Sequence, residues 1–170
     1  AIDGGPVIYR HDRVGKNGRM FGCLKFRSMY RDAGRRLEAI LESDPARRKE
    51  WEESQKLSDD PRVHRFGQLL RRSSLDELPQ LLNVLRGEMS LVGPRPIVPD
   101  ELRRYGEHAD CYLSVTPGIT GLWQVSGRNG TGYDERVRLD VEYVRTRSTL
   151  RDLMIMLKTV RVVLWAQNGM

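Results

Sequence analysis

The stretch SSLDELPQLLNVLRGEMSLVGPRP, residues 73–96, carries the strongest structural and chemical signals in the chain. Four of its leucines recur at the i, i+3, i+4, i+7 spacing that places side chains on one face of a helix. These leucines are Leu78, Leu81, Leu82 and Leu85. The spacing predicts a helix that packs this leucine face against the core of the protein.

Two adjacent carboxylates, Asp76 and Glu77, stand at the start of this predicted helix. Ser74 and Glu77 match the Ser-x-x-Glu capping box, and Pro79 suits only a first helical turn. The helix therefore begins at Ser74 or nearer Asp76. Either start places both acids where the helix dipole favours negative charge and bound phosphate. On a helical wheel Asp76 lies opposite the leucine face, which directs it towards a cleft or solvent.

Arg95 follows the acidic pair by about twenty residues and is held between Pro94 and Pro96. Paired carboxylates bind Mg²⁺, attack phosphorus or move protons, whereas a guanidinium matches the oxygens of a phosphate. The prolines restrict the backbone and so reduce the entropy that Arg95 loses on binding. The combination indicates chemistry on a phosphate. Acids are also common in a first helical turn, so a purely structural role for the pair stays open.

The N-terminal part predicts a β-hairpin, with strands at residues 7–9 and 20–26 and an Asn-Gly turn within residues 13–19. The following residues 30–58 predict a charged helical hairpin. Because charges dominate both of its halves, we expect it to be solvated and to lie outside the site. A further short strand is predicted at residues 122–125.

The last predicted helix has apolar side chains on one face and basic side chains beside them. The apolar residues are Leu150, Leu153, Met154, Leu157, Val160 and Leu164, and the basic ones are Arg151, Lys158 and Arg161. Basic amphipathic helices often lie on membrane surfaces, but a helix packed on the core has the same pattern. Both interpretations stay open.

The 170 residues, 39% of them hydrophobic, suffice for one domain with its own core. A net charge of +6 indicates an anionic partner, either nucleic acid, nucleotide phosphate or an acidic membrane surface. Nucleic acid is not expected, because acids interrupt the basic residues and no nucleic-acid-binding motif appears. Cys23 and Cys111 form no zinc-ligand pattern with the three histidines. These features predict a single helix-rich α+β domain with a short β-hairpin or small sheet.

Four segments occur in the order in which a known family carries its motifs. They are GPVIYRHDRVGKNGRMFGCLKFRSM (5–29), DPRVHRFGQLLRRSSLDELPQLLNVLRGEMSLVGPRP (60–96), TPGITGLWQVSGRN (116–129) and YDERVRLDVEYV (133–144) with the basic tail after it. The chain resembles the bacterial sugar transferases that act on polyprenyl phosphate, the monotopic phosphoglycosyl transferases. Four ordered segments, which together cover most of the chain, are far more specific than any one of them.

The resemblance implies a membrane-associated catalytic domain that moves a sugar-1-phosphate from a UDP-sugar to undecaprenyl phosphate and releases UMP. Asp76 would be the nucleophile and would carry a covalent phosphosugar intermediate, and Glu77 would tune Asp76 or help to hold the metal. Asp76 and Glu77 are the implied ligands of Mg²⁺, with Mn²⁺ as a possible substitute. The reaction would initiate synthesis of an exopolysaccharide, a capsule or an O-antigen. Because adjacent carboxylates repel, we expect a raised pKa at one of them.

The same resemblance implies further contacts with the substrate. Lys25, Arg27 and Arg95 would bind its phosphates, while Arg128 and Asn129 would contact the nucleotide. By contrast, the residues themselves predict a solvated surface for Arg71-Arg72 and for Arg103-Arg104. His64 has no partner in the sequence and is expected to be structural.

Family members carry a hydrophobic membrane helix just before the segment at which this chain begins. The resemblance therefore implies a catalytic domain, residues 1–170, without that N-terminal membrane segment. It would act at the cytoplasmic face of the bacterial inner membrane, and the chain given would be soluble or peripheral. The third segment looks more like members that use UDP-galactose than like those that use UDP-glucose. The alternatives are a domain of the same fold without catalysis and a basic domain that binds nucleic acid.

Overall fold

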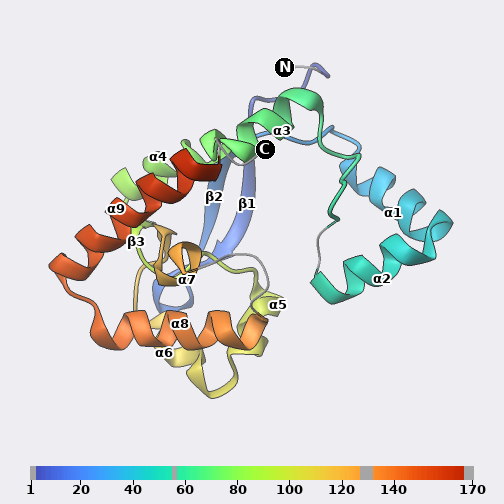
Figure 1. The fold of residues 1–170 in the computed structure, drawn as a ribbon. Coiled ribbons are helices and arrows are strands. Elements are labelled where there is room, and N and C mark those ends of the chain that lie inside the picture. Colours follow the sequence, from blue (N-terminus) through green and yellow to red (C-terminus); the bar gives the residue numbers. More distant parts are fainter. Residues whose placement is uncertain (1–2, 55–56, 127–131, 167–170) are drawn as a thin grey trace.

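The structure is a computed structural model and describes residues 3–54, 57–126 and 132–166. It is a helix-rich α+β domain with two small sheets (Figure 1). Its α-helices are α1 (Ala33–Ser43), α2 (Pro45–Ser54), α3 (Arg65–Arg72), α4 (Gln80–Leu85), α5 (Pro99–Leu102), α6 (Ala109–Leu113), α7 (Leu122–Val125), α8 (Tyr133–Thr146) and α9 (Thr149–Ala166). Short 3-10 helices occur at η1 (Lys16–Gly18), η2 (Leu75–Glu77) and η3 (Arg103–His108).

The first sheet is an antiparallel hairpin of β1 (Ile8–Val14) and β2 (Met20–Phe26). The turn between the strands contains Asn17 and Gly18, whose φ angles of 57° and 75° lie in the left-handed region. Asparagine and glycine tolerate this region better than other residues do, which is why the local sequence was sufficient to locate the turn. The predicted hairpin is confirmed, and its second strand has the predicted bounds.

The second sheet is a parallel pair, β3 (Ser90–Val92) and β4 (Gly118–Thr120). A Cβ atom on Gly118 would lie 2.1 Å from the backbone nitrogen of Gly93, so only glycine allows the two segments to approach. The prediction of a strand at residues 122–125 is wrong, because this segment forms the helix α7. The amide of Gln124 donates to the carbonyl of Ile119 at 2.8 Å and helps to fold α7 back onto β4.

The largest group of buried hydrophobic residues joins the end of β1 to α6 and α8. Its members are Val14, Ile97, Tyr105, Tyr112, Val137 and Val141. The hydroxyl of Tyr112 donates to the carbonyl of Val14 at 2.8 Å and accepts the N–H of Ile97 at 3.3 Å. The N–H of Val14 also donates to the carbonyl of Ile97 at 2.9 Å. These bonds fix the segment that follows Pro94-Arg95-Pro96 against the end of the hairpin.

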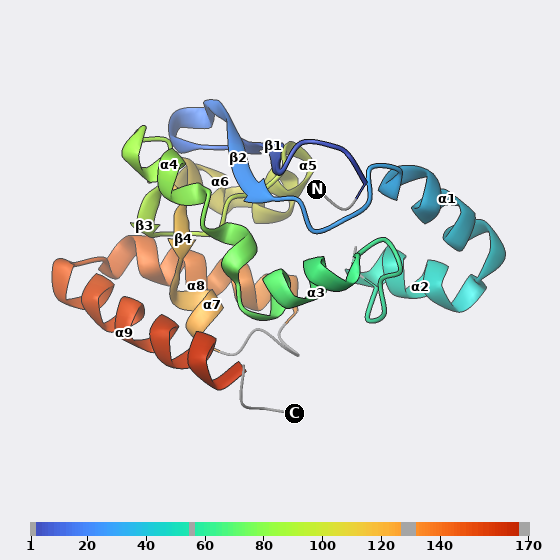
Figure 2. The same ribbon diagram turned by 90° about the horizontal axis from the view of Figure 1, so that it is seen from above.

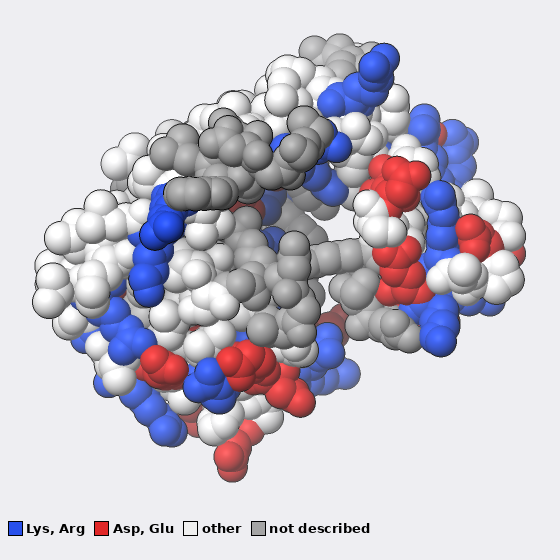
Figure 3. Space-filling view, viewed as in Figure 1, with Lys and Arg blue, Asp and Glu red and all other residues white. Residues whose placement is uncertain are grey.

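The helices α1 and α2 form an arm that extends away from the remaining helices (Figures 1 and 2). α1 has no buried residue, as expected for a charged, solvated segment. Figure 3 shows acidic and basic side chains mixed over this arm. At its base, the guanidinium of Arg62 lies 4.8 Å from the ring centre of Trp51.

The leucine face of α4 is turned outward, so the prediction that it packs on the core is wrong. Its exposed members are Leu78, Leu81, Leu82 and Leu85, the last of them 83% exposed. The predicted capping box is also absent, because Ser74 has a left-handed φ of 57° and its side chain makes no capping bond. A capping residue needs an extended backbone, and α4 begins only at Gln80, after the 3-10 turn η2.

The buried face of α4 is polar, which explains the outward leucines. The side chain of Asn83 is fully buried, and its oxygen accepts the N–H of Leu24 at 3.0 Å. Its amide nitrogen donates to the carbonyl of Gly22 at 2.9 Å and to Glu88 Oε2 at 2.7 Å. Asn83 thus bonds to the backbone of β2, and these bonds determine which side of α4 faces inward.

The outer face of α9 is apolar as well. Its exposed members are Leu150, Leu153, Met154, Leu157 and Val160, whereas the side chain of Leu164 lies outside the described part. α9 packs through its opposite side, where Ile155 is buried and the hydroxyl of Thr159 lies 2.7 Å from that of Thr120. The interpretation in which the predicted apolar face packs on the core is therefore wrong.

We predict that Asn83→Ala lowers the free energy of unfolding by about 2–4 kcal/mol, because it leaves buried backbone groups of β2 without partners. Urea denaturation monitored by circular dichroism measures this change. The control Gln68→Ala, at an exposed position of α3, is expected to stay within about 0.5 kcal/mol of the parent. An Asn83→Ala protein as stable as the control would contradict the role of Asn83.

Candidate active site

The acidic pair lies in η2, where the chain passes from α3 to α4 against β2. Glu77 Oε1 accepts a hydrogen bond from Lys25 Nζ at 2.6 Å. Lys25 and Cys23 lie on the same face of β2, because side chains two residues apart in a strand point the same way. The structure thus brings Lys25 to the acidic pair, although 51 residues or more separate them along the chain.

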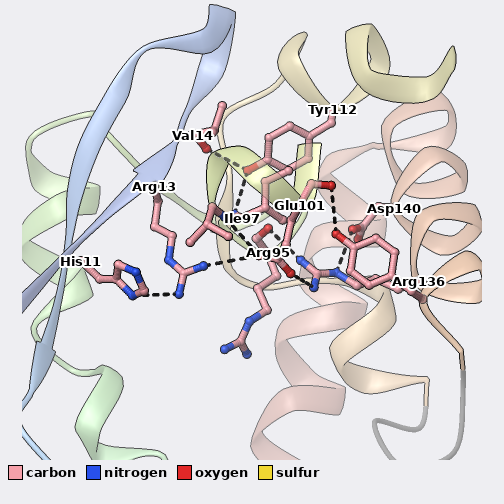
Figure 4. Close-up of polar contacts among 11 residues, drawn as sticks. His11, Arg13, Val14, Arg95, Ile97, Glu101, Tyr112, Arg136 and Asp140 are labelled. Carbon is pink, nitrogen blue, oxygen red and sulfur yellow. Dashed lines mark hydrogen bonds and ion pairs between the residues drawn. The ribbon is translucent and has the colours of Figure 1, made fainter. Parts of the chain in front are cut away.

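A small pocket opens beside this ion pair. It is lined by Arg13, Cys23, Lys25, Glu77, Gln80, Arg95, Pro96, Ile119 and Gln124. Arg95 is partly buried, and among the described residues its side chain has no hydrogen-bond or ion-pair partner. In Figure 4 its guanidinium extends away from the contacts behind it. An unpaired guanidinium beside a lysine suits an incoming phosphate.

Asp76 is 9% exposed. Burial raises its pKa above the ordinary value, Lys25 lowers it, the neighbouring Glu77 raises it further, and Arg71 lowers it. The expectation of a raised pKa at one of the two acids is confirmed for Asp76. Burial contributes more than the repulsion between the carboxylates on which that expectation rested.

Arg71 is exposed, as predicted, but it also lies near this site. Its Nε donates to the hydroxyl of Ser28 at 2.8 Å, and its charge acts on Asp76. Gly67 lies one turn earlier in α3, where a Cβ atom would lie 2.0 Å from the carbonyl oxygen of Ser28. A glycine four residues before Arg71 was the signal in the sequence that this face of α3 meets another segment closely.

Arg27 lies just beyond β2 and donates to Asp3 Oδ1 at 2.7 Å, so the structure places it outside the pocket. Arg128 and Asn129 lie outside the described residues, and their predicted contacts with the nucleotide stay predictions. His64 is structural, as expected: its Nδ1 accepts the N–H of Gly67 and caps the start of α3.

Sequence reasoning missed several residues of the pocket, among them Arg13 and Gln80. Arg13 comes from the turn end of β1, next to the Asn-Gly turn. Gln80 is 3% exposed, and its side-chain amide makes no hydrogen bond to another described residue. Gln80 follows Asp76 by four residues, the helical spacing of a shared face, and this spacing was the available signal.

The family of the chain follows from comparison with known proteins. The family model described as bacterial sugar transferase matches residues 1–166.

The chain belongs to the bacterial sugar transferase family.

Named relatives agree with this family. The chain is 55% identical over 162 residues to an undecaprenyl-phosphate galactose phosphotransferase of Salmonella typhimurium, covering 95% of this chain and 34% of the relative. It is 53% identical over 161 residues to the exopolysaccharide production protein ExoY of Sinorhizobium fredii, covering 95% and 71%. An undecaprenyl-phosphate glucose phosphotransferase of Komagataeibacter xylinus is 43% identical over 177 residues, covering 97% and 30%. The chain thus spans about a third of the length of several curated relatives that it matches.

The acidic pair could provide two carboxylate ligands for a divalent cation such as Mg²⁺. Among the described residues, no group of three or more His, Cys, Asp or Glu side chains could hold a metal ion. Mg²⁺ is commonly bound through one or two carboxylates together with substrate phosphates and water. Asp76 and Glu77 supply such carboxylates beside a pocket with cationic walls. This pair of oxygen donors is chemically suited to Mg²⁺.

The raised pKa of Asp76 predicts a cost in stability. Ionising an acid whose pKa is higher in the folded state than in the unfolded chain destabilises the fold. For Asp76 this cost is absent below the pKa of the unfolded chain, near 3.8, and is complete above the pKa of the folded state. Asp76→Asn should therefore unfold at a higher temperature than the parent at pH 8, with the difference shrinking towards pH 4. The exposed control Asp12→Asn should show no such gain. A lower melting temperature for Asp76→Asn at pH 8 would refute this reasoning.

Proposed function

We propose that this chain transfers a sugar-1-phosphate from a UDP-sugar to undecaprenyl phosphate, releases UMP, and thereby initiates synthesis of a bacterial polysaccharide. The observation that supports this most strongly is that Glu77, Lys25 and the unpaired Arg95 line one pocket. Asp76 is next to Glu77 in the chain and interacts with the charge of Lys25. The names of the relatives support the choice of acceptor, since two of them act on undecaprenyl phosphate.

In the first step, a carboxylate oxygen of Asp76 attacks the β-phosphorus of the UDP-sugar. The bond from this phosphorus to the bridging oxygen breaks, and UMP leaves with the electron pair. The sugar phosphate remains attached to Asp76 as an acyl phosphate. Attack requires the ionised carboxylate, and Lys25 and Arg71 favour ionisation against the effect of burial.

In the second step, a phosphate oxygen of undecaprenyl phosphate attacks the same phosphorus. The bond to Asp76 breaks, the carboxylate is restored, and the product is undecaprenyl-diphospho-sugar. Two displacements at one phosphorus allow donor and acceptor to react in turn, so the two anions need not be held together.

The cations of the pocket would act on the charge of the phosphates. Lys25 and Arg95 lie where they can stabilise negative charge that develops on the phosphoryl oxygens. Asp76 and Glu77 would hold Mg²⁺, which would offset the charge of the diphosphate. The ion pair of Glu77 with Lys25 keeps both side chains in place at the pocket.

Galactose is the sugar that we propose, because the relative named for galactose transfer is 55% identical and the one named for glucose is 43% identical. UDP-galactose is then the donor and UDP-glucose the alternative. The order of initial rates with the two donors decides between them.

The proposed acceptor is a lipid, and three elements along the upper side of the ribbon in Figure 1 carry exposed apolar side chains. α3 contributes Phe66 and Leu69, the segment from η2 to α4 contributes Leu75, Leu78, Leu81, Leu82 and Leu85, and α9 contributes the five exposed residues named above. Figure 3 shows mainly uncharged side chains over the described part of α9. None of the helices in the described ranges is long and apolar enough to cross a bilayer.

We propose that this apolar face rests on the cytoplasmic surface of the bacterial inner membrane. Exposed leucines cost free energy in water, at about 25 cal/mol for each Å² of apolar surface, and a membrane interface removes this cost. The acidic pair lies in the same segment as the exposed leucines of η2 and α4, so the pocket would open close to the lipid phosphate.

The release of UMP from UDP-galactose tests the proposed reaction. With undecaprenyl phosphate in detergent, the parent should release UMP, and Asp76→Asn should reduce turnover by at least about 10³-fold while remaining folded. Circular dichroism checks that the variant is folded. Rapid turnover by a verified Asp76→Asn sample would exclude Asp76 as the nucleophile.

The metal requirement is tested in the same assay. EDTA should stop UMP release, and added Mg²⁺ or Mn²⁺ should restore it. A rate unaffected by EDTA would remove the metal from the proposal.

Binding to phospholipid vesicles tests the membrane face. Replacing Leu82 and Leu85 together by glutamate should reduce binding to vesicles that contain anionic phospholipid by tenfold or more, since each buried leucine contributes about 1.5–3 kcal/mol. The exposed control Ala39→Glu on α1 should bind like the parent. Equal sedimentation of the double variant and the control with the vesicles would show that α4 does not contact the lipid.

A further inference from the structure

Glu101, the last acidic residue of α5, lies between two arginines from distant parts of the chain (Figure 4). Its Oε2 accepts the N–H of Val98 at 3.0 Å and lies 3.5 Å from an amino nitrogen of Arg13. Its Oε1 accepts from Arg136, in α8, at 3.3 Å. One partly buried carboxylate therefore joins the first strand, α5 and α8.

Arg136 reaches from Glu101 to the backbone of the Pro94-Arg95-Pro96 segment. It is almost fully buried, and its second amino group donates to the backbone carbonyl of Arg95 at 3.4 Å. The rings of Trp123 and Tyr133 lie 5.0 and 5.2 Å from its guanidinium carbon, which holds the group from its sides. Arg136 thus supports the backbone at Arg95, while the side chain of Arg95 points away from it (Figure 4).

Arg13 has a second acceptor besides Glu101. Its other amino group lies 3.1 Å from Nδ1 of His11, and since a guanidinium can only donate, Nδ1 must accept. Burial, together with the charges of Arg13 and Lys25, lowers the pKa of His11, which keeps the ring neutral and able to accept. The two acceptors, Glu101 and His11, orient Arg13, which lines the same pocket as Lys25 and Glu77.

We propose that Glu101 is a positioning residue that sets two arginines at the phosphate site, Arg13 directly and Arg95 through Arg136. Arg13 is then a further ligand for the diphosphate of the donor. This inference deepens the proposed function and rests on it, because it assigns how that pocket binds its substrate.

Electrostatics explain why a carboxylate is needed at this place. Arg95 and Arg136 both repel Arg13, and burial adds to the cost of its charge. Glu101 opposes this cost for Arg13 and pairs with Arg136 as well. Arg136 also has Asp140 at 3.8 Å, whereas Glu101 is the carboxylate that Arg13 and Arg136 share. Without its negative charge, repulsion between Arg13 and Arg136 would no longer be offset between them. Arg13 would then lose its orientation, and the backbone at Arg95 would lose its support.

The test compares Glu101→Gln, Arg13→Gln and the double variant, using steady-state UMP release from UDP-galactose. Glutamine keeps an oxygen that can accept the N–H of Val98 but removes the charge. Glu101→Gln and Arg13→Gln should each raise KM for UDP-galactose on the order of tenfold, with a smaller change in kcat. Because Glu101 acts partly through Arg13, the double variant should lose less than the product of the two single losses. Losses that multiply would show that Glu101 does not act through Arg13 and would overturn the proposal.

The control Glu107→Gln removes a carboxylate that is fully accessible in η3, and it should leave KM unchanged. Calorimetric titration with UDP is a second readout that does not need turnover. If the parent binds UDP without releasing UMP from UDP-galactose, the proposed function fails, yet weaker UDP binding by Glu101→Gln still supports the positioning role. Equal UDP affinity in Glu101→Gln and the parent overturns that role whatever the turnover.

Should Glu101→Gln not fold, Arg136→Lys tests the same path. Lysine keeps the charge but lacks the planar fork that reaches both Glu101 and the carbonyl of Arg95. Arg136→Lys should weaken UDP binding, whereas Arg138→Lys, at an exposed position of the same helix, should not. Parent-like UDP affinity in a folded Arg136→Lys protein would overturn the part of the proposal that concerns Arg95.

Discussion

The bonds of the buried Asn83 amide to the backbone of β2 are the constraint on which the rest of the site depends. They hold the polar side of α4 against the hairpin, with Asn83 Oδ1 on the N–H of Leu24 and Nδ2 on the carbonyl of Gly22. The same docking places η2 beside β2, which brings Glu77 to Lys25. It also leaves the leucines of α4 outside, at the face that we propose to rest on the membrane. The orientation of α4 thus both brings Glu77 to Lys25 and turns the leucines towards the proposed membrane surface.

Charge balance is the second requirement of the pocket. Two adjacent carboxylates, one of them buried, are unfavourable together, and Lys25 and Arg71 offset part of this cost. Arg13 and Arg136 share Glu101, whereas the side chain of Arg95 has no partner among the described residues. An anionic substrate would therefore complete an arrangement in which one cation is left without a partner. The raised pKa of the buried Asp76 is consistent with a residue that has a chemical role.

The features that short-range patterns determine were predictable from the sequence. The Asn-Gly turn located the hairpin, and the ordered motifs gave the family and brought Asp76, Glu77, Lys25 and Arg95 into one proposal. Periodicity identified which leucines share a face of α4, but it cannot tell whether that face is buried. The answer lies in bonds between Asn83 and a strand about sixty residues away in sequence. The roles of Arg13 and Arg71 were likewise missed, because their partners come from other elements.

The intact mass of the protein after brief incubation with UDP-galactose, without lipid acceptor and with an acid quench, tests the central claim most directly. The claim is that Asp76 carries a phosphosugar between the two displacements. The account predicts an added mass equal to one galactose phosphate, located by peptide mapping at Asp76 and absent from Asp76→Asn. UMP release without any adduct in the parent, or an adduct that persists in Asp76→Asn, would contradict it.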